Sequence, residues 1–300
     1  MLKKKAIRKI IITTFVFFVV MTIYMIPSKN KKNEITYNNI KTRDVSVYLL
    51  NSYDQLTKVN FKVNDDNINS IIESIINKLT ISNDATIPEG YIQLLPNDIT
   101  INDIFLDEGI INIKFNDEFF NIPKDNIEKI VESIAYSLLE LKEIKGVSIY
   151  VENDNISKLY DNLVPEIITK EYGINKRVEI NSLNNISKVT IYYLDNVNND
   201  YFVPVTKYIN DDREKIKIIV DELSSNYVYE SNLISLLDKN IKLLDYQIKD
   251  GNITLDFSNS IFLEQDKVLE EVLYSVFANY DVDSVTLTVN KKEIYSKKNN

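Results

Sequence analysis

Short stretches of alternating apolar and polar residues recur along the chain and predict β-strands. Two of them, at 45–50 and 189–194, read VSVYLL and VTIYYL and lie 144 positions apart. A second such stretch follows each, at 58–63 and 201–205, and Pro204 places the latter at a sheet edge or a strand end because proline has no N–H to donate. This recurrence predicts that one folding unit occurs twice in the chain.

Apolar residues at helical spacing follow both pairs of strands. From Ile68 they fall at i, i+3, i+4, i+7, i+8 and i+11, which predicts an amphipathic helix over 68–79. The last four of these positions recur 144 residues later, at Ile216, Ile219, Val220 and Leu223. An Asn-Asp-Asp triplet precedes each helix, at 64–66 and 210–212, and we interpret both triplets as helix caps and not as metal ligands.

Each half continues with a hairpin, a longer helix and a closing strand. The predicted ranges are, in this order, 99–115, 127–141 and 147–151 in the first half, and 241–257, 268–276 and 285–289 in the second. Gly109 and Gly251 mark the hairpin turns, since glycine accepts a positive φ without steric cost. Tyr-Ser pairs at 136–137 and 274–275 align in the two longer helices. The repeated unit is therefore ββαββαβ, and the fold class is α+β.

The N-terminal segment predicts a membrane anchor. Residues 10–26 read IIITTFVFFVVMTIYMI without a charge, and as a helix they would extend about 26 Å, just enough to span a bilayer. Five basic residues precede this run and three follow it, which favours a cytoplasmic N-terminus with the rest of the chain outside. A cleaved signal peptide is the alternative, although no Ala-x-Ala pattern follows the run.

Six segments are expected along the chain. They are a cytoplasmic basic tail at 1–9, a transmembrane anchor at 10–26, a juxtamembrane tether at 27–44, a first domain at 45–152, a connector at 153–187 and a second domain at 188–296. The tether is polar and lacks apolar periodicity. The connector contains Asn, Lys and Asp clusters and a possible short helix near 157–163, and we expect it to pack partly on its neighbours.

The composition excludes several kinds of chemistry. The chain has no His, Cys or Trp, which removes Ser-His-Asp and Cys-His nucleophilic sites, His or Cys metal sites and disulfides. Its five glycines are too far apart for a P-loop or a GxGxxG motif. Beyond residue 32 the chain carries 27 basic and 44 acidic residues, a net charge of −17, which disfavours nucleic acids and other polyanions as partners of the folded part.

The remaining candidates for chemistry have simpler structural explanations. A Ser-x-x-Lys at 28–31 reads as the basic flank of the anchor, and Asp256 alternates with apolar neighbours, so we expect it to face solvent from a half-buried strand. The acidic and amide residues at 195–200 lack the glycine and the glutamate of a calcium loop and indicate a polar turn. We therefore expect no catalytic residues, no cofactor-binding residues, no metal ligands and no cofactor.

Several segments together resemble the GerMN domain, the repeated unit of GerM-type sporulation and spore germination proteins of Gram-positive spore formers. They read VTIYYLD, YFVPVTKYI, IKLLDYQIKDGNITLDFS, VLYSVF and SVTLTV, and the two copies cover 45–294. The resemblance implies two tandem ββαββαβ GerMN-type domains, similar at the level of the fold to ring-building-motif modules, after an N-terminal transmembrane helix. GerM-type proteins are commonly lipoproteins, from which this chain departs because it has no Cys.

The resemblance also implies a non-enzymatic, membrane-anchored scaffold that assembles a cell-envelope complex during sporulation or spore germination. Its GerMN domains would lie outside the cytoplasm, in an intermembrane space or on the wall side, and its partners would be extracytoplasmic proteins or further copies of itself. One alternative is a module that binds a wall fragment or a germinant in a groove between the copies, although a small-molecule ligand is not favoured. A carboxylate-based cell-wall hydrolase is the last alternative.

Overall fold

The protein is described from a computed structural model. The structure describes residues 4–25, 42–65, 67–160, 163–196, 198, 200–225, 232–259 and 265–299. The chain forms two compact units, Met1–Ile40 and Lys41–Asn300, and each is described by itself. Both copies of the repeat lie in the second unit.

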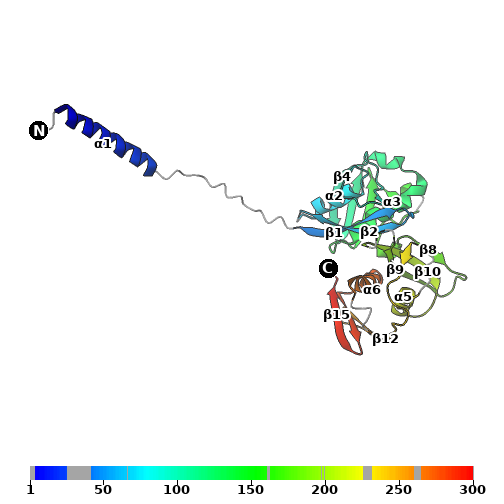
Figure 1. Ribbon diagram of the computed structural model, residues 1–300. Coiled ribbons are helices and arrows are strands. Elements are labelled where there is room, and N and C mark those ends of the chain that lie inside the picture. Colours follow the sequence, from blue (N-terminus) through cyan, green and yellow to red (C-terminus); the bar gives the residue numbers. More distant parts are fainter. Residues whose placement is uncertain are drawn as a thin grey trace. The chain divides into compact units, whose positions relative to one another are not determined.

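The first unit contains helix α1 (Lys4–Met25), drawn in dark blue in Figure 1. Large apolar side chains on this helix, such as Phe15 and Phe17, are exposed. Within the described residues, no helix combines the length and the apolarity needed to cross a membrane. The anchor expected at 10–26 is therefore not supported by the structure, and the tether expected at 27–44 lies outside the described residues as far as residue 41.

The main elements of both copies follow the predicted order. In the first copy they are β1 (Arg43–Asn51), β2 (Leu56–Val63), α2 (Ile68–Leu79), β3 (Tyr91–Ile92), β4 (Ile101–Asp107), β5 (Ile110–Phe115), η1 (Asp117–Asn121), α3 (Lys124–Leu139), β6 (Gly146–Val151) and β7 (Asp154–Asn155). In the second copy they are β9 (Ile186–Asp195), β10 (Phe202–Asn210), α5 (Lys215–Ser224), β11 (Leu233–Ile234), β12 (Leu243–Lys249), β13 (Asn252–Phe257), α6 (Asp266–Asn279), β14 (Ser284–Val289) and β15 (Lys292–Lys298).

Each copy contains two strands more than the expected ββαββαβ unit. These are β3 and β7 in the first copy, and β11 and β15 in the second. Strand β15 reads KEIYSKK and pairs antiparallel with β14. Its four charged residues interrupt the apolar alternation by which a strand is predicted from sequence. The unit is therefore longer at its C-terminal end than the sequence pattern indicates.

The hairpin turns and the amphipathic helices agree with the sequence pattern. Glu108 and Gly109 have φ of 47° and 86°, and Asp250 and Gly251 have φ of 49° and 72°, as two-residue hairpin turns with positive φ at both positions require. The apolar stripe of 68–79 is buried along helix α2. Both predictions are thus confirmed.

The helix caps differ from the expected Asn-Asp-Asp triplets. Asn67 caps α2, because its side chain accepts hydrogen bonds from the backbone N–H groups of Asn69 and Ser70. In the second copy the residue at the cap position is Glu214, and Asp211 accepts from the backbone N–H of Arg213. The cap positions therefore lie beyond the triplets, at Asn67 and Glu214, and the interpretation of the triplets as caps was wrong; Asp66 lies outside the described residues.

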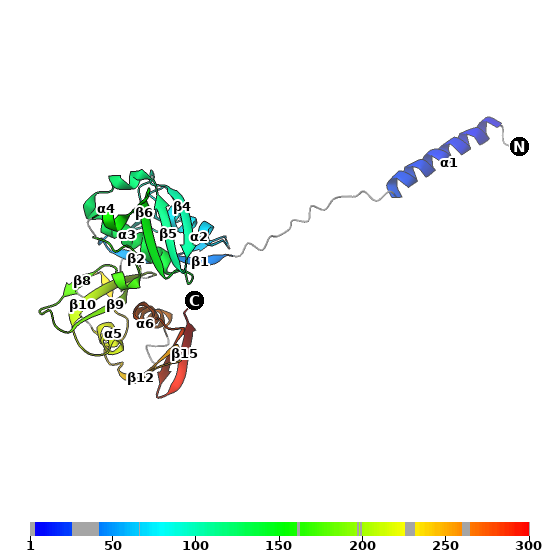
Figure 2. The same cartoon turned by 180° about the vertical axis from the view of Figure 1, so that it is seen from behind.

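The two copies share one sheet, with the order β11-β9-β10-β2-β1-β3. The order is palindromic, since β3, β1 and β2 of the first copy occupy the places that β11, β9 and β10 occupy in the second. Strands β2 and β10 join the halves in antiparallel register at Lys58 and Phe202. Figures 1 and 2 show this sheet at the junction of the copies from opposite sides.

Each copy also has its own four-stranded sheet and its own hydrophobic core. The orders are β4-β5-β6-β7 and β12-β13-β14-β15, so β4 and β12 are edge strands. Helices α2 and α3 contact β1 of the shared sheet, and α5 and α6 contact β9. One core joins the helices and both sheets of the first copy, and a second core does the same in the second copy.

Pro204 lies inside the shared sheet, not at its edge. It pairs with Tyr192 of β9 on one side, and the other side of β10 contacts β2 at residue 202 and β8 (Arg177–Glu179) at 207–209. The proline falls between these two neighbours, where a missing N–H removes no ladder bond. The edge prediction was therefore wrong, although its physical reason holds locally.

The connector packs against both copies. Within it, α4 (Ile156–Leu159) follows β7, η2 (Lys170–Tyr172) precedes a turn, and β8 pairs in parallel with β10. The Asn175 side chain accepts from the Leu56 backbone N–H at 2.9 Å and donates to the carbonyls of Leu56 and Pro204 at 2.8 Å each. The connector therefore links β2 to β10, and so joins the two copies directly.

Candidate functional site

Equivalent residues of the two copies meet at the junction. Tyr48 and Tyr192, which are 144 positions apart, bring their hydroxyl oxygens to 2.8 Å, and both side chains are buried. Asn51 and Asp195 are also 144 apart, and the Asn51 amide donates to the Asp195 carboxylate at 3.1 Å. A two-fold arrangement brings equivalent residues together in this way. The repetition in sequence thus builds the joint between the copies.

Two serines on the long helices hold the tyrosines in place. The backbone N–H of Tyr48 donates to Ser137 Oγ at 2.9 Å, and that of Tyr192 donates to Ser275 Oγ at 3.0 Å. Each serine donates in turn to the carbonyl four residues earlier in its own helix. The aligned Tyr-Ser pairs of the sequence therefore fix α3 on β1 and α6 on β9.

A charged pair lies beside the two tyrosines. The Tyr48 hydroxyl donates to Glu140 Oε1 at 2.7 Å, and the Lys58 ammonium lies 2.7 Å from Glu140 Oε2. Because a hydroxyl has one proton to donate, the Tyr192 hydroxyl donates to Tyr48. The Lys58 side chain is 8% exposed, and its ammonium lies 4.2 Å from the ring centre of Tyr274, within cation–π range.

The surroundings set the protonation of this cluster. Burial raises the pKa of Glu140, whereas the charges of Lys58 and Lys170 and the hydrogen bonds from Lys58 and Tyr48 lower it. The lowering effects together outweigh burial, so the pKa of Glu140 is below its usual value. Burial and the charge of Glu140 raise the pKa values of the Tyr48 and Tyr192 hydroxyls. Glu140 is therefore ionised at neutral pH, and both hydroxyls keep their protons.

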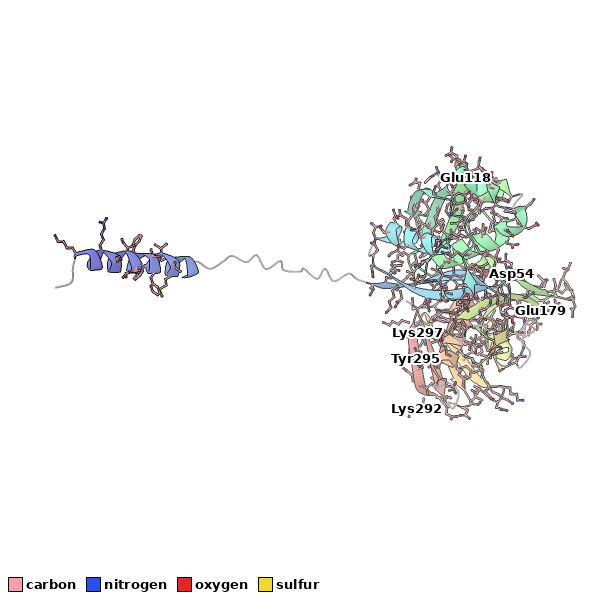
Figure 3. The ribbon with its side chains drawn as sticks, turned by 45° about the horizontal axis from the view of Figure 1, so that its top comes forward. Asp54, Glu118, Glu179, Lys292, Tyr295 and Lys297 are labelled. Atoms are coloured by element: carbon pink, nitrogen blue, oxygen red, sulfur yellow. The ribbon has the colours of Figure 1, made fainter. Side chains whose placement is uncertain are left out.

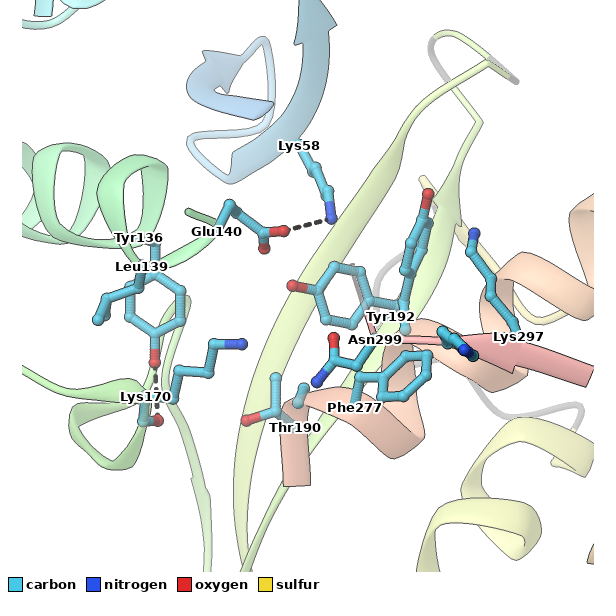
Figure 4. A pocket seen from close by; sticks show the side chains of 13 residues that line it. Lys58, Tyr136, Leu139, Glu140, Lys170, Thr190, Tyr192, Phe277, Lys297 and Asn299 are labelled. Carbon is cyan, nitrogen blue, oxygen red and sulfur yellow. Dashed lines mark hydrogen bonds and ion pairs between the residues drawn. The ribbon is translucent and has the colours of Figure 1, made fainter. Parts of the chain in front are cut away.

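A cavity of about 200 Å³ opens next to this cluster, between the two copies. Its walls combine aromatic rings, lysines, the Glu140 carboxylate and small polar groups, and Figure 4 shows them from close by. The lining residues are Lys58, Tyr136, Leu139, Glu140 and Lys170 of the first copy and connector, and Thr190, Tyr192, Tyr274, Phe277, Ala278, Lys297, Lys298 and Asn299 of the second copy. Both copies therefore contribute to one concave site.

A second buried polar cluster joins the copies at Asp195. Its carboxylate accepts from Asn51, from the Tyr91 hydroxyl at 3.0 Å and from the Thr57 hydroxyl, and the Asp195 side chain is fully buried. Burial and the charge of Asp195 raise the pKa of Tyr91, which therefore remains a donor. Asp195 was expected to begin a polar turn; it is instead the last residue of β9, and its side chain is buried against the first copy.

Asp256 also differs from its prediction. It is 8% exposed, and its Oδ1 accepts from the Thr288 hydroxyl at 2.7 Å and from the Lys291 backbone N–H at 2.8 Å. These bonds hold the turn between β14 and β15, so the side chain does not face solvent. The hydrogen bonds from Lys291 and Thr288 lower the pKa of Asp256. A carboxylate bound in this way orders a turn and is not positioned as a proton donor.

Metal-binding and nucleophilic sites were the other candidates. Among the described residues, no group of three or more acidic side chains is placed to hold a metal ion. The Ser-x-x-Lys at 28–31 lies outside the described residues.

Sequence reasoning did not identify Tyr48, Lys58 or Glu140 as neighbours. The tyrosines gave a usable signal, because the same residue type occupies the same position in both copies. The charged pair gave no such signal, because its residues differ between the copies. Lys58 pairs with Tyr48 and Pro204 pairs with Tyr192, so Pro204 is the equivalent of Lys58, and Ala278 is the equivalent of Glu140. The charged pair thus lies where the two copies differ.

Comparisons with known proteins agree with this architecture. A family model described as "Sporulation and spore germination" (Germane) matches residues 46–157 and 190–295. The spore germination protein GerM of Bacillus subtilis (strain 168) is 30% identical over an alignment of 227 residues. The match covers 71% of this chain and 62% of that protein, so the chain spans less than two thirds of the relative's length.

A solved structure agrees as well. The tandem GerMN domains of the sporulation protein GerM from Bacillus subtilis match with a TM-score of 0.73 and 26% identity, over 84% of this chain and 92% of that one. Both matches carry the name of a sporulation or germination protein, and neither name is that of an enzyme. The chain therefore belongs to the Germane family of sporulation and spore germination proteins and contains two tandem GerMN domains.

Proposed function

We propose that this chain is a non-enzymatic scaffold that holds two GerMN domains as one rigid body, for assembly of a cell-envelope complex during sporulation or germination. The observation that carries the proposal is the continuous sheet across the copies, held by the buried Tyr48–Tyr192 and Asn51–Asp195 bonds. Two domains fixed in this way present their outer surfaces at a constant separation. A fixed separation between the two domains suits a scaffold protein that positions the other components of a complex.

The edge strands are the surfaces that would contact partners. Phe105 on β4 is 49% exposed and Ile248 on β12 is 50% exposed, and each lies on the outermost strand of its four-stranded sheet. An apolar side chain on a sheet edge gains from burial against another protein, and the strand edge offers backbone groups for pairing. We infer that extracytoplasmic proteins or further copies of this chain dock there.

The location outside the cytoplasm belongs to the same proposal. It rests on the uncharged run at 10–26 with its basic flanks, and on the naming of the relatives as sporulation and germination proteins. Protease added to intact protoplasts would cleave the GerMN domains if this orientation holds. Full protection, with cleavage only after lysis, would contradict it.

The scaffold role is tested by heat-resistant spore counts in a deletion strain. Full-length chain should restore the count, whereas Phe105→Lys and Ile248→Lys should not, because a charge on the edge opposes docking. Leu183→Lys is the matched control, since Leu183 is 87% exposed and belongs to the connector and to neither edge strand. An unchanged count in the deletion strain, or equal effects of all three substitutions, would overturn the proposal.

A further inference from the structure

We propose that the cavity between the copies binds a small carboxylate whose body is a flat or sugar-like ring. The inference is independent of the scaffold role, because it rests on the walls of the cavity and is tested with purified protein. Three features of the cavity carry it: its rings, its cations and its position across the joint.

Aromatic rings form much of the wall. Tyr136 comes from the first copy, and Tyr192, Tyr274 and Phe277 come from the second. Tyr192 and Tyr274 contact each other with ring centres 5.5 Å apart, so this part of the wall is already packed and rigid. Rigid aromatic walls favour planar or pyranose bodies, which contact them over a large apolar area at little entropic cost.

Lysines supply the charge. Lys58 is neutralised by Glu140, but among the described residues no ion pair joins Lys170, Lys297 or Lys298 to a carboxylate. Figure 4 shows Lys170 extending from the connector toward Thr190 and Asn299 of the second copy. These three lysines are positively charged, and the one carboxylate in the cavity wall, that of Glu140, is already paired with Lys58. The cavity is therefore positively charged, whereas the chain beyond residue 32 has a negative net charge. An anion is therefore the ligand that its charge favours.

The C-terminal strand brings two of these lysines to the site. Figure 3 shows Lys292 at the end of β15 far from the first copy and Lys297 at the near end. The Lys297 ammonium lies 5.5 Å from the ring centre of Tyr274, so cation and ring are presented together. This pairing matches a ligand whose carboxylate is attached directly to a ring.

The size and position of the cavity limit the ligand further. A volume of about 200 Å³ is below the usual range for drug-sized ligands and admits one ring with one or two carboxylates. A ligand there would contact both copies at once, beside the Tyr48–Tyr192 bond. Its binding would stabilise the joined arrangement, since only the joined form contains the site.

Calorimetry on the full-length chain tests the inference with defined probes. Isophthalate represents an aromatic dicarboxylate, glucuronate a sugar acid, benzamide a neutral ring and inorganic phosphate an anion without a ring. We expect isophthalate or glucuronate to bind with a dissociation constant below about 1 mM, weakened by added salt, and benzamide to bind at least about tenfold more weakly. Which of the two carboxylates binds more tightly identifies the source of the ring.

Substitutions then locate the site. Lys170→Ala and Lys297→Ala should each weaken binding about tenfold, whereas Lys292→Ala, on the same strand as Lys297 but away from the cavity, should leave it unchanged. Equal melting temperatures would show that the variants are folded. The proposal is overturned if neither carboxylate binds at about 10 mM, if phosphate binds as tightly as both, or if Lys292→Ala weakens binding as much as Lys297→Ala.

Discussion

Replacing Glu140 by glutamine tests the energetic role of the charged pair at the joint. Glutamine keeps the size of the side chain but removes the charge that neutralises Lys58, whose side chain is only 8% exposed. Breaking a fully buried pair by removing one partner costs about 3–5 kcal/mol. The Glu140 side chain is 21% exposed to the cavity, so water partly compensates Lys58. We therefore expect Glu140→Gln to lower the free energy of unfolding by about 2–3 kcal/mol.

A double-mutant cycle separates the pair from its surroundings. Lys58→Met should cost about 1–2 kcal/mol, because the Glu140 carboxylate keeps its hydrogen bond from Tyr48. The double variant should lose less than the sum of the two single losses, by about 1–2 kcal/mol, since it leaves no charge without its partner. Asp221→Asn breaks the exposed Arg213–Asp221 pair and serves as control, with an expected loss below about 1 kcal/mol.

The measurement is urea unfolding of the full-length chain, followed by far-ultraviolet circular dichroism at pH 7. The pH dependence gives an independent check. The pKa of Glu140 in the folded chain is below its ordinary value of 4.5, so its stabilising contribution is present above pH 4.5 and disappears as the pH falls through the folded pKa. The difference between wild type and Glu140→Gln should shrink accordingly. Additive single losses, or a Glu140→Gln loss no larger than that of Asp221→Asn, would refute the reasoning.

Two further substitutions have distinct expected results. Burial raises the pKa of Glu271 well above 4.5, so this side chain destabilises the fold as the pH rises from about 4.5 toward its folded pKa. In urea unfolding, the free energy of unfolding of the wild type should therefore fall between pH 4 and 7, and Glu271→Gln should remove this fall. An equal fall in both proteins would contradict the prediction. Gly251→Ala should lower stability by more than about 1 kcal/mol, since φ is +72° and a Cβ would lie 2.5 Å from Asp283 Oδ2, whereas an unchanged melting temperature would show that the turn adapts.

The sequence predicts local elements well and their assembly poorly. Helix α2, the two hairpins and both closing strands follow from periodicity and glycine placement, which depend on neighbours in the chain. Strand β15 was missed because its charged residues reach solvent while only Ile294 and Tyr295 pack on the second core. The strand is stabilised by backbone hydrogen bonds to β14, which its amino-acid composition does not indicate.

The candidate site could not be predicted for a different reason. Its residues come from positions as distant as Lys58 and Asn299, and they meet only because β2 pairs with β10 in the shared sheet. That pairing involves one residue pair in register, and no periodic pattern in either strand specifies it. Asp195 and Asp256 show the same limit, because alternation in a strand cannot indicate which side a second sheet or a turn will cover.

Some residues at the junction are identical in the two copies and others differ, and the two groups form different interactions. Tyr48 and Tyr192, being equivalent, meet each other and hold the joint, and their partners Ser137 and Ser275 are equivalent too. Lys58 and Glu140 have no charged equivalents, since Pro204 and Ala278 occupy the corresponding positions. A perfectly repeated pair of domains would therefore have a symmetric joint without this charged pair. The charged pair arises where the repeat is broken, so substitutions at matched and at unmatched positions of the junction should both alter stability.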